Sequence, residues 1–219
     1  MEKEELRVLI LSAGKIDNEL VKIFGEIPSG LIPLNGKPVI FRIIDKLLDE
    51  GFGKITITVG YKKEILEQIV REQYKNQCDL EFISTDFKKP PGNSIKTATN
   101  YFDEEKLLII LGDTLIENNL IDLVNKGRNF VITSQEFSHT KNWCVVTKSE
   151  NKIDEIFDKE ELVDSERYHA LVGCYFINNQ NSLKNVLSDF SDDENLEISS
   201  IIKKIKDKEG FQLEFAKKW

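Results

Sequence analysis

Two short segments contain residue types that could bind a nucleotide. Ser12-Ala13-Gly14 follows the apolar run from Leu6 to Leu11, and small residues at such a turn let backbone N–H groups approach a phosphate or a base closely. Gly112-Asp113 follows a second apolar run, from Leu107 to Leu111. A carboxylate there can hold Mg²⁺, which bridges one or two carboxylates to substrate phosphates. Each segment also has a structural interpretation, as a glycine turn or as an Asp that caps a turn.

The elements around these segments predict a Rossmann-like α/β fold. In the first half, apolar runs alternate with segments of helical periodicity, an order typical of a parallel sheet with right-handed crossovers. We expect strands at 6–11, 55–59, 80–83 and 107–111 and helices at 38–51, 62–74 and 94–102. A polar stretch with Gly and Pro, 15–38, interrupts this alternation.

The second half has shorter connections, which indicate mixed or antiparallel additions to the sheet. Strands are expected at 130–133, 144–147, 153–157, 171–177 and 211–215, and helices at 181–190 and 196–206. Together, residues 1–219 are predicted to form a single domain with a mixed, mainly parallel sheet and helices on both faces. In such open sheets a ligand binds outside the carboxyl ends of the strands, where the strand order reverses.

Composition and charge narrow the function classes. The net charge of −8 makes nucleic acid a poor partner, although local donors can still bind a small anion. Cys78, Cys144 and Cys174 lack metal-ligand spacing, and His139 and His169 are the only histidines. The first residues are too acidic for a signal peptide, and no apolar run reaches membrane-spanning length. We therefore expect a cytoplasmic protein without a nucleic-acid or membrane partner, and the oligomeric state stays open.

An ordered set of motifs resembles the sugar-phosphate nucleotidyltransferases, which make nucleotide-sugars and activated alcohols. Leu11-Ser12-Ala13-Gly14 resembles the start of their Gly-rich loop, and Gly36-Lys37-Pro38 resembles their helix start. Four later segments resemble, in order, the base-contacting loop, the metal-binding motif, the acceptor site and a Gly-hydrophobic-Tyr strand: Pro91-Gly92-Asn93-Ser94, Leu111-Gly112-Asp113-Thr114, Asp158-Lys159 and Val172-Gly173-Cys174-Tyr175-Phe176.

The resemblance implies a nucleotide-diphospho-sugar transferase-like fold and a reaction. An acceptor phosphate attacks the α-phosphorus of a nucleoside triphosphate (NTP), and pyrophosphate leaves. Asp113 would be catalytic and would hold Mg²⁺, and Lys159 would be catalytic at the acceptor phosphate, near Asp158 and Gly173. The nucleotide would be contacted by Leu11, Ser12, Ala13, Gly14, Gly92, Asn93 and Gly112.

Two departures from the family pattern remove positive charge from the phosphate site. The usual Arg of the Gly-rich loop falls on Asn18, and the usual Lys of the Pro-Lys-x-Leu element falls on Ser29. Loss of one such donor typically costs about two to three orders of magnitude in rate. Lys15 is the preferred substitute cation and would be catalytic, whereas Lys22 and the pair Lys88-Lys89 are weaker candidates.

Three functional interpretations follow. The first is a nucleotidyltransferase acting on an NTP and a sugar phosphate or phosphorylated alcohol, and the second is a catalytically silent nucleotide-binding or regulatory subunit of the same fold. The third, a glycosyltransferase, usually requires an Asp-x-Asp element that Gly112-Asp113-Thr114-Leu115 lacks. The family carries a second metal-binding Asp near the end of this domain. Since Trp219 stops short of that place, we expect a domain truncated at its C-terminus.

Overall fold

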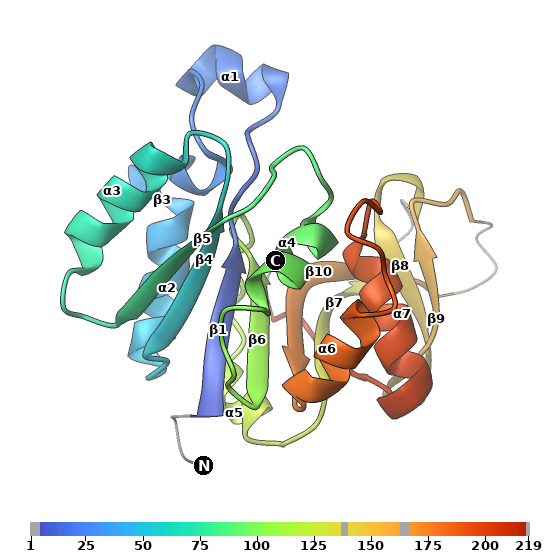
Figure 1. Cartoon of the computed structure of the whole chain (residues 1–219). Helices are drawn as coiled ribbons and strands as arrows, with labels where there is room; N and C mark the ends of the chain where they lie inside the picture. The colour runs from blue at the N-terminus through green and yellow to red at the C-terminus, as the bar shows by residue number, and fades with distance from the viewer. Residues whose placement is uncertain (1–4, 137–139, 163–166, 218–219) are drawn as a thin grey trace.

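The computed structural model describes residues 5–136, 140–162 and 167–217, so His139 and Trp219 lie outside the described residues. Most strands form one large sheet in the order β5-β4-β1-β6-β10-β7-β11-β9-β8 (Figure 1). Their bounds are β1 (Leu6–Leu11), β4 (Lys54–Val59), β5 (Asp79–Ser84), β6 (Lys106–Leu111), β7 (Phe130–Glu136), β8 (Cys144–Ser149), β9 (Lys152–Asp158), β10 (His169–Ile177) and β11 (Gln212–Phe215).

The first half of the chain forms the parallel part of the sheet, as predicted. β1 pairs in parallel with β4 on one side and with β6 on the other, and β5 continues the sheet beyond β4. The strand order therefore reverses between β1 and β6. Both strands are almost wholly apolar because helices cover both faces of the sheet here.

The second half adds mainly antiparallel strands, which confirms the expectation of a mixed sheet. β10 is antiparallel to β6, β7 and β8, and β8 and β9 form an antiparallel pair. β11 returns in parallel beside β7. These additions form a second lobe beside the parallel lobe, on the right of Figure 1.

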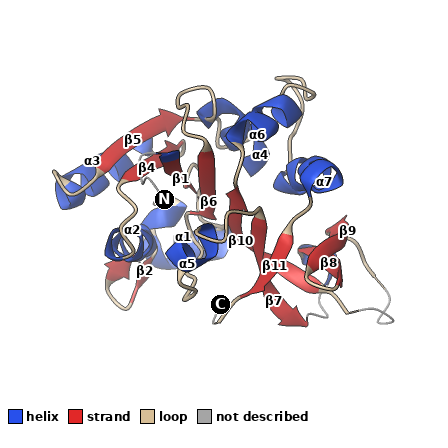
Figure 2. Cartoon of the chain, turned by 90° about the horizontal axis from the view of Figure 1, so that it is seen from below, coloured by secondary structure: helices blue, strands red, loops and turns tan. Residues whose placement is uncertain are grey.

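Helices cover both faces of the sheet, as Figure 2 shows from below. Alternate residues of β1 point to opposite faces, so Val8 and Ile10 belong to one hydrophobic core and Leu9 and Leu11 to another. The first core is covered by α2 (Val39–Asp49), α3 (Lys63–Tyr74) and α5 (Leu120–Val124), and the second by α4 (Pro91–Ala98), α6 (Gln180–Leu187) and α7 (Ile198–Glu209). No helix in the described parts of the chain is long and apolar enough to span a membrane.

The stretch 15–38 contains regular structure that the sequence analysis did not predict. Helix α1 (Asn18–Phe24) buries none of its residues and projects from the rest of the molecule in Figure 1. A single 3-10 turn (Ser29–Leu31) and the two-residue strands β2 (Pro33–Leu34) and β3 (Lys37–Pro38) follow. Pro38 is extended and pairs with Pro33, so helix α2 begins one residue later than predicted.

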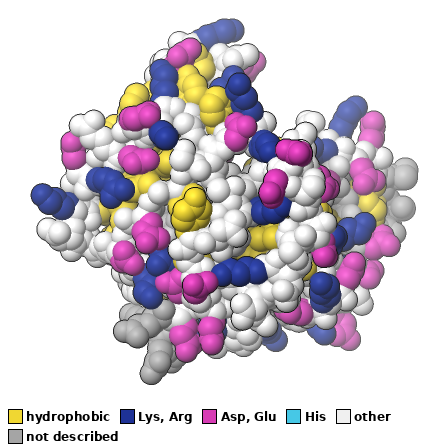
Figure 3. All heavy atoms as spheres, in the orientation of Figure 1, with side chains coloured by type: hydrophobic (Ala, Val, Ile, Leu, Met, Phe, Trp, Pro, Cys, Tyr) yellow, Lys and Arg dark blue, Asp and Glu magenta, His cyan; other side chains and the backbone are white. Residues whose placement is uncertain are grey.

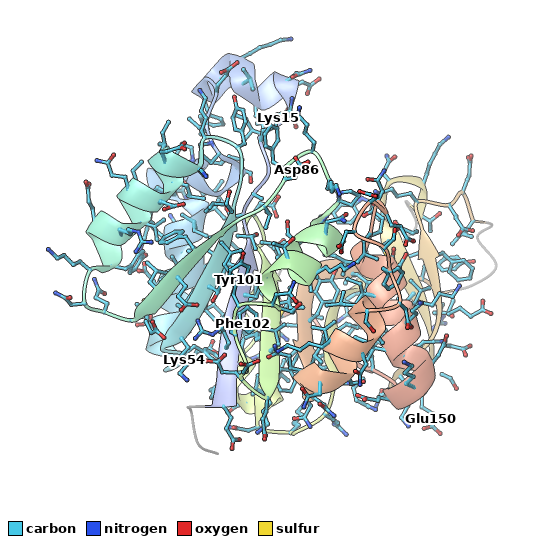
Figure 4. The ribbon with its side chains drawn as sticks, in the orientation of Figure 1. Lys15, Lys54, Asp86, Tyr101, Phe102 and Glu150 are labelled. Carbon is cyan, nitrogen blue, oxygen red and sulfur yellow. The ribbon has the colours of Figure 1, made fainter. Side chains whose placement is uncertain are left out.

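A buried ion-pair network lies at the amino ends of the parallel strands. Arg7 on β1 is only 5% exposed, and its guanidinium donates to Thr56 Oγ1 at 3.0 Å, Glu81 Oε2 at 2.8 Å and Glu104 Oε1 at 2.9 Å. Lys54 also donates to Glu104, at 3.2 Å. Figure 4 shows Lys54 toward the end of the sheet opposite Lys15, so this network is remote from the loop after β1.

Candidate active site

A pocket of about 290 Å³ lies at the carboxyl ends of β1 and β6, where the strand order reverses. This is the expected place for a ligand in an open α/β sheet. It brings together two loops that are about a hundred residues apart in sequence, together with the loop after β5. The lining residues are Leu11, Ala13, Gly14, Lys15, Ser29, Phe87, Lys89, Pro91, Ser94, Leu111 and Asp113.

Backbone hydrogen bonds fix the loop after β1. Ala13 O accepts from the N–H of Tyr61 at 2.9 Å, and Gly14 O accepts from the N–H of Ser29 at 3.2 Å. Gly60 is needed beside this loop because an added Cβ would lie 2.9 Å from both Ala13 O and Thr85 O. The loop is therefore held in place before any ligand arrives, which lowers the ordering cost of binding.

Ser12 has a packing role that its sequence position did not reveal. Its side chain is 1% exposed and lies between two glycines: an added Cβ would come within 2.5 Å of Ser12 Oγ at Gly30 and within 2.7 Å of Ser12 Cβ at Gly112. No described residue forms a hydrogen bond with this hydroxyl. The side chain therefore does not line the pocket, and a nucleotide contact by the Ser12 backbone stays a prediction.

The packing around Ser12 predicts that Gly30→Ala destabilises the protein and that Ser12→Ala partly reverses the effect. Overpacking typically costs about 1–3 kcal/mol, whereas removing an unpaired buried hydroxyl relieves both the contact and its desolvation. Urea unfolding of both single variants and the double variant measures this. The double variant should be more stable than Gly30→Ala alone, and equal or lower stability would contradict the packing argument.

Asp113 is placed to act on a ligand. Its side chain is exposed at the pocket, and no described residue donates a hydrogen bond to it or forms an ion pair with it. The described residues also contain no cluster of three or more His, Cys, Asp or Glu side chains that could hold a metal. A lone carboxylate suits Mg²⁺, which keeps several waters and takes other ligands from substrate phosphates.

The positive charge at this pocket comes from lysines. Lys15 is exposed at the pocket and lies at the upper end of the molecule in Figure 4. Lys89 also lines the pocket, and its ammonium donates to Asp192 O at 2.8 Å. Asn18 is the first residue of α1 and does not line the pocket, whereas Ser29 does. Ser29 therefore lies where the resemblance predicts a cation, and Lys15 and Lys89 line the same pocket.

The residues expected at the acceptor lie outside this pocket, near the end of β9. Lys159 has a positive φ of 57°, its N–H donates to Trp143 O at 3.0 Å, and its ammonium is 3.8 Å from Glu197 Oε1. Ser199 Oγ donates to Asp158 Oδ2. The structure therefore joins this pair to the start of α7.

Gly173 connects the second lobe to the pocket. It has a φ of 88° at an irregularity of β10, and an added Cβ would lie 2.7 Å from Leu111 Cδ1. Leu111 lines the pocket, so a side chain at position 173 would push against the pocket wall. A direct contact of Gly173 with the acceptor stays a prediction.

Gly92 and the Asn93 side chain face the segment 194–196, which precedes α7, instead of the pocket. An added Cβ at Gly92 would lie 2.2 Å from Leu196 O, and both polar atoms of the Asn93 side chain bond to the segment 194–196. The neighbouring Pro91 and Ser94 line the pocket. The first turn of α4 therefore borders the pocket, but the close packing of Gly92 depends on a contact about a hundred residues away. Nucleotide contacts by Gly92 and Asn93 stay predictions, and for Asn93 the backbone would make them, because its side chain is bonded to the segment 194–196.

The fold and the site define an α/β protein whose pocket, at the strand-order reversal of the sheet, combines apolar residues with two lysines and an aspartate. The chain belongs to the nucleotidyl transferase family, whose model matches residues 8–219. This confirms the family resemblance and the predicted fold class.

Relatives and solved structures agree with this family. The chain is 27% identical to the UTP–glucose-1-phosphate uridylyltransferase AglF of Haloferax volcanii over 71% of this chain and 66% of that protein. It is 32% identical to the bifunctional protein GlmU of Methanocaldococcus jannaschii over 74% of this chain and 38% of that protein. The chain thus spans less than two thirds of these relatives.

Solved structures share the fold at low sequence identity. A putative glucose-1-phosphate thymidylyltransferase from Bacillus anthracis has a TM-score of 0.81 and 17% identity, over 98% of this chain and 88% of that one. The inositol-1-phosphate CTP transferase from T. maritima has a TM-score of 0.77 and 14% identity, over 95% of this chain and 84% of that one.

Proposed function

We propose that the chain binds an NTP in the 290 Å³ pocket and transfers its nucleotidyl group to a sugar phosphate or a phosphorylated alcohol. The observation that carries the proposal is the convergence of the Ala13–Gly14 backbone, Lys15 and Asp113 on one pocket. The uridylyltransferase and CTP transferase named above, which differ in nucleobase and acceptor, support the reaction class but not a particular pair of substrates.

In the proposed reaction, an acceptor phosphate oxygen forms a bond with the α-phosphorus of the NTP. The bond from this phosphorus to the β-phosphate oxygen breaks, and pyrophosphate leaves. Ala13 and Gly14 would line the nucleotide through their backbone, Lys15 would stabilise the leaving group, and Lys159 would orient the acceptor. Asp113 would hold Mg²⁺, which supplies positive charge to the phosphates when bound.

The acceptor surface of the proposed site is partly neutral. Burial, together with the nearby Asp158 carboxylate, raises the pKa of the Cys144 thiol to about 12, so Cys144 is an uncharged neighbour of Asp158. In the proposal Lys159 faces the acceptor phosphate, and its ammonium is 3.8 Å from Glu197 Oε1. Because NTPs are held inside the cell, the proposed reaction would take place in the cytoplasm.

The proposal is tested by pyrophosphate release and by thermal shift. Each of CTP, UTP, GTP, ATP and dTTP is tested with Mg²⁺ and a panel of phosphorylated sugars and alcohols. We expect at least one NTP to raise the apparent melting temperature and to release pyrophosphate with one acceptor. Lys15→Ala should lower kcat about tenfold or more, while Lys75→Ala, at an exposed residue after α3 that does not line the pocket, should not change it. Absence of pyrophosphate with every pair would contradict the proposal.

A further inference from the structure

The loop that precedes α7 contacts both parts of the proposed site, the nucleotide pocket and the acceptor pair Asp158–Lys159. This segment, 188–197, connects α6 to α7 and is called the α6–α7 loop below. At one end it is bonded to residues of α4 and of the loop before it. At the other end, Glu197 and the first turn of α7 contact Asp158 and Lys159.

Asn93 on α4 makes two hydrogen bonds with the backbone of the α6–α7 loop. Asn93 Nδ2 donates to Glu194 O at 2.8 Å, and Asn93 Oδ1 accepts from the N–H of Leu196 at 2.9 Å. The Asn93 side chain thus bonds to the backbone of the loop in both directions, as a neighbouring strand would. Since Asn93 is only 9% exposed, water replaces these bonds poorly.

Further contacts keep the loop close to the nucleotide pocket. Gly92 packs directly against the Leu196 backbone, so the distance between α4 and the loop has little freedom. Lys89, which lines the pocket, donates to Asp192 O at 2.8 Å, and Lys96 donates to Phe190 O at 2.6 Å. A shift of the pocket wall at 89–93 would therefore move the α6–α7 loop with it.

The bonds at the second end reach the proposed acceptor residues. Glu197 immediately follows Leu196 along the chain, and its carboxylate is 3.8 Å from the Lys159 ammonium. Two residues later, Ser199 donates to Asp158. Because Asn93 fixes Leu196, it also fixes the start of α7, from which both of these contacts are made.

We propose that Asn93 is a positioning residue that couples the nucleotide pocket to the acceptor pair Asp158–Lys159 through the segment 194–199. The inference rests on the proposed function, in which this pair faces the acceptor phosphate. Asn93 acts through the backbone of Leu196 and not by touching the reacting atoms. Occupation of the pocket by a nucleotide would then order the acceptor side before the acceptor binds.

The kinetic test uses Asn93→Ala with Asn100→Ala as its matched control. Asn100 follows α4 and is exposed. Loss of the two buried hydrogen bonds should raise the KM for the acceptor about tenfold or more, while the KM for the NTP changes by less than about twofold. Asn100→Ala should change neither. An equal rise in the KM for the acceptor and in the KM for the NTP would contradict a positioning role, because general destabilisation of the site would affect both substrates.

A double-mutant cycle tests the route of the coupling. Ser199→Ala removes the bond to Asp158 at the far end of the segment and should also raise the KM for the acceptor. If both residues act through the segment 194–199, the double variant raises this KM by less than the product of the two single effects. An effect equal to that product would overturn the proposed route.

Hydrogen exchange separates failure of this inference from failure of the proposed function. The probe is the NTP that gives the largest thermal shift, with Mg²⁺. In the wild type it should slow amide exchange at 11–15 and also at 158–159 and 194–199, whereas in Asn93→Ala only 11–15 should be protected. Protection at 11–15 alone in the wild type would overturn the coupling and leave the nucleotide site intact. No protection at 11–15 with any NTP would overturn both.

Discussion

Arg7→Ala should lower the free energy of unfolding by about 3 kcal/mol. Removing one partner from a buried ion pair leaves an uncompensated charge and typically costs about 3–5 kcal/mol. Here Glu104, whose side chain is 9% exposed, would lose the guanidinium but keep Lys54 and its own backbone hydrogen bond, which moderate the loss. Urea unfolding near neutral pH measures the change.

The matched control for this variant is Arg71→Ala. The guanidinium of Arg71 lies over the Phe82 ring at 4.5 Å, but the residue is exposed. Such a contact contributes only about 0.5–1 kcal/mol. Equal losses in the two variants would show that the Arg7 network contributes no more than a surface cation, which would contradict the prediction.

The same network predicts how stability depends on pH. Burial acts to raise the pKa of Glu104, but the hydrogen bond and charge of Arg7 outweigh it, so the pKa is lowered in the folded state. The stabilisation is therefore complete above the unfolded value of about 4.3 and is lost as the pH falls through the lower folded value. Arg7→Ala removes most of this pH-dependent stabilisation. The difference in the free energy of unfolding between wild type and variant should therefore become smaller in acid.

Helix α1 shows what hydrophobic periodicity cannot detect. The segment 18–24 contains Leu20, Val21, Ile23 and Phe24, but it has only seven residues and buries none of them, so it is too short for a helical period to be recognised. The local signal was Asp17, whose carboxylate accepts from the N–H groups of Glu19 and Leu20, both at 2.9 Å. The sequence resemblance treated these positions as a phosphate loop, whereas Asp17 caps a helix that carries Asn18 outside the pocket.

The strands were predicted well because burial on both faces leaves long apolar runs, as in β1 and β6. The approach of the loops after these two strands also follows from the parallel topology. The remaining features of the site depend on contacts between residues that are far apart in the sequence, which a pattern of neighbouring residues cannot show. Gly30 faces Ser12, Gly92 faces Leu196, and Gly173 faces Leu111. In each pair the glycine makes room for a partner that only the folded chain identifies.

The net charge of the protein does not determine the charge at the pocket. Acidic and basic side chains are interspersed over the face shown in Figure 3, which carries no continuous basic surface for a nucleic-acid backbone. The pocket nevertheless gathers Lys15 and Lys89 beside Asp113. A protein with a net charge of −8 can therefore present local cations to a small polyphosphate.

Asp113→Asn should lower kcat for nucleotidyl transfer by about 100- to 1000-fold. A neutral amide binds a hard cation far less well than a carboxylate, and charge neutralisation by a bound metal contributes several kcal/mol to such reactions. Since the side chain is exposed and has no partner among the described residues, the protein should keep its fold. Pyrophosphate release at one fixed Mg²⁺ concentration measures the loss, and unfolding by urea checks stability.

Asp103→Asn provides the matched control, because Asp103 has a 99% exposed side chain and, among the residues that the structure describes, pairs with Lys184 at the surface. The same chemical change there should leave kcat unchanged.

The pair of variants also separates an enzyme from a silent nucleotide-binding subunit. In a silent subunit, NTP and Mg²⁺ would raise the melting temperature of the wild type without pyrophosphate release. If the wild type turns over and Asp113→Asn does not, catalysis depends on the carboxylate at the end of β6, and the cations lost at Asn18 and Ser29 have been replaced.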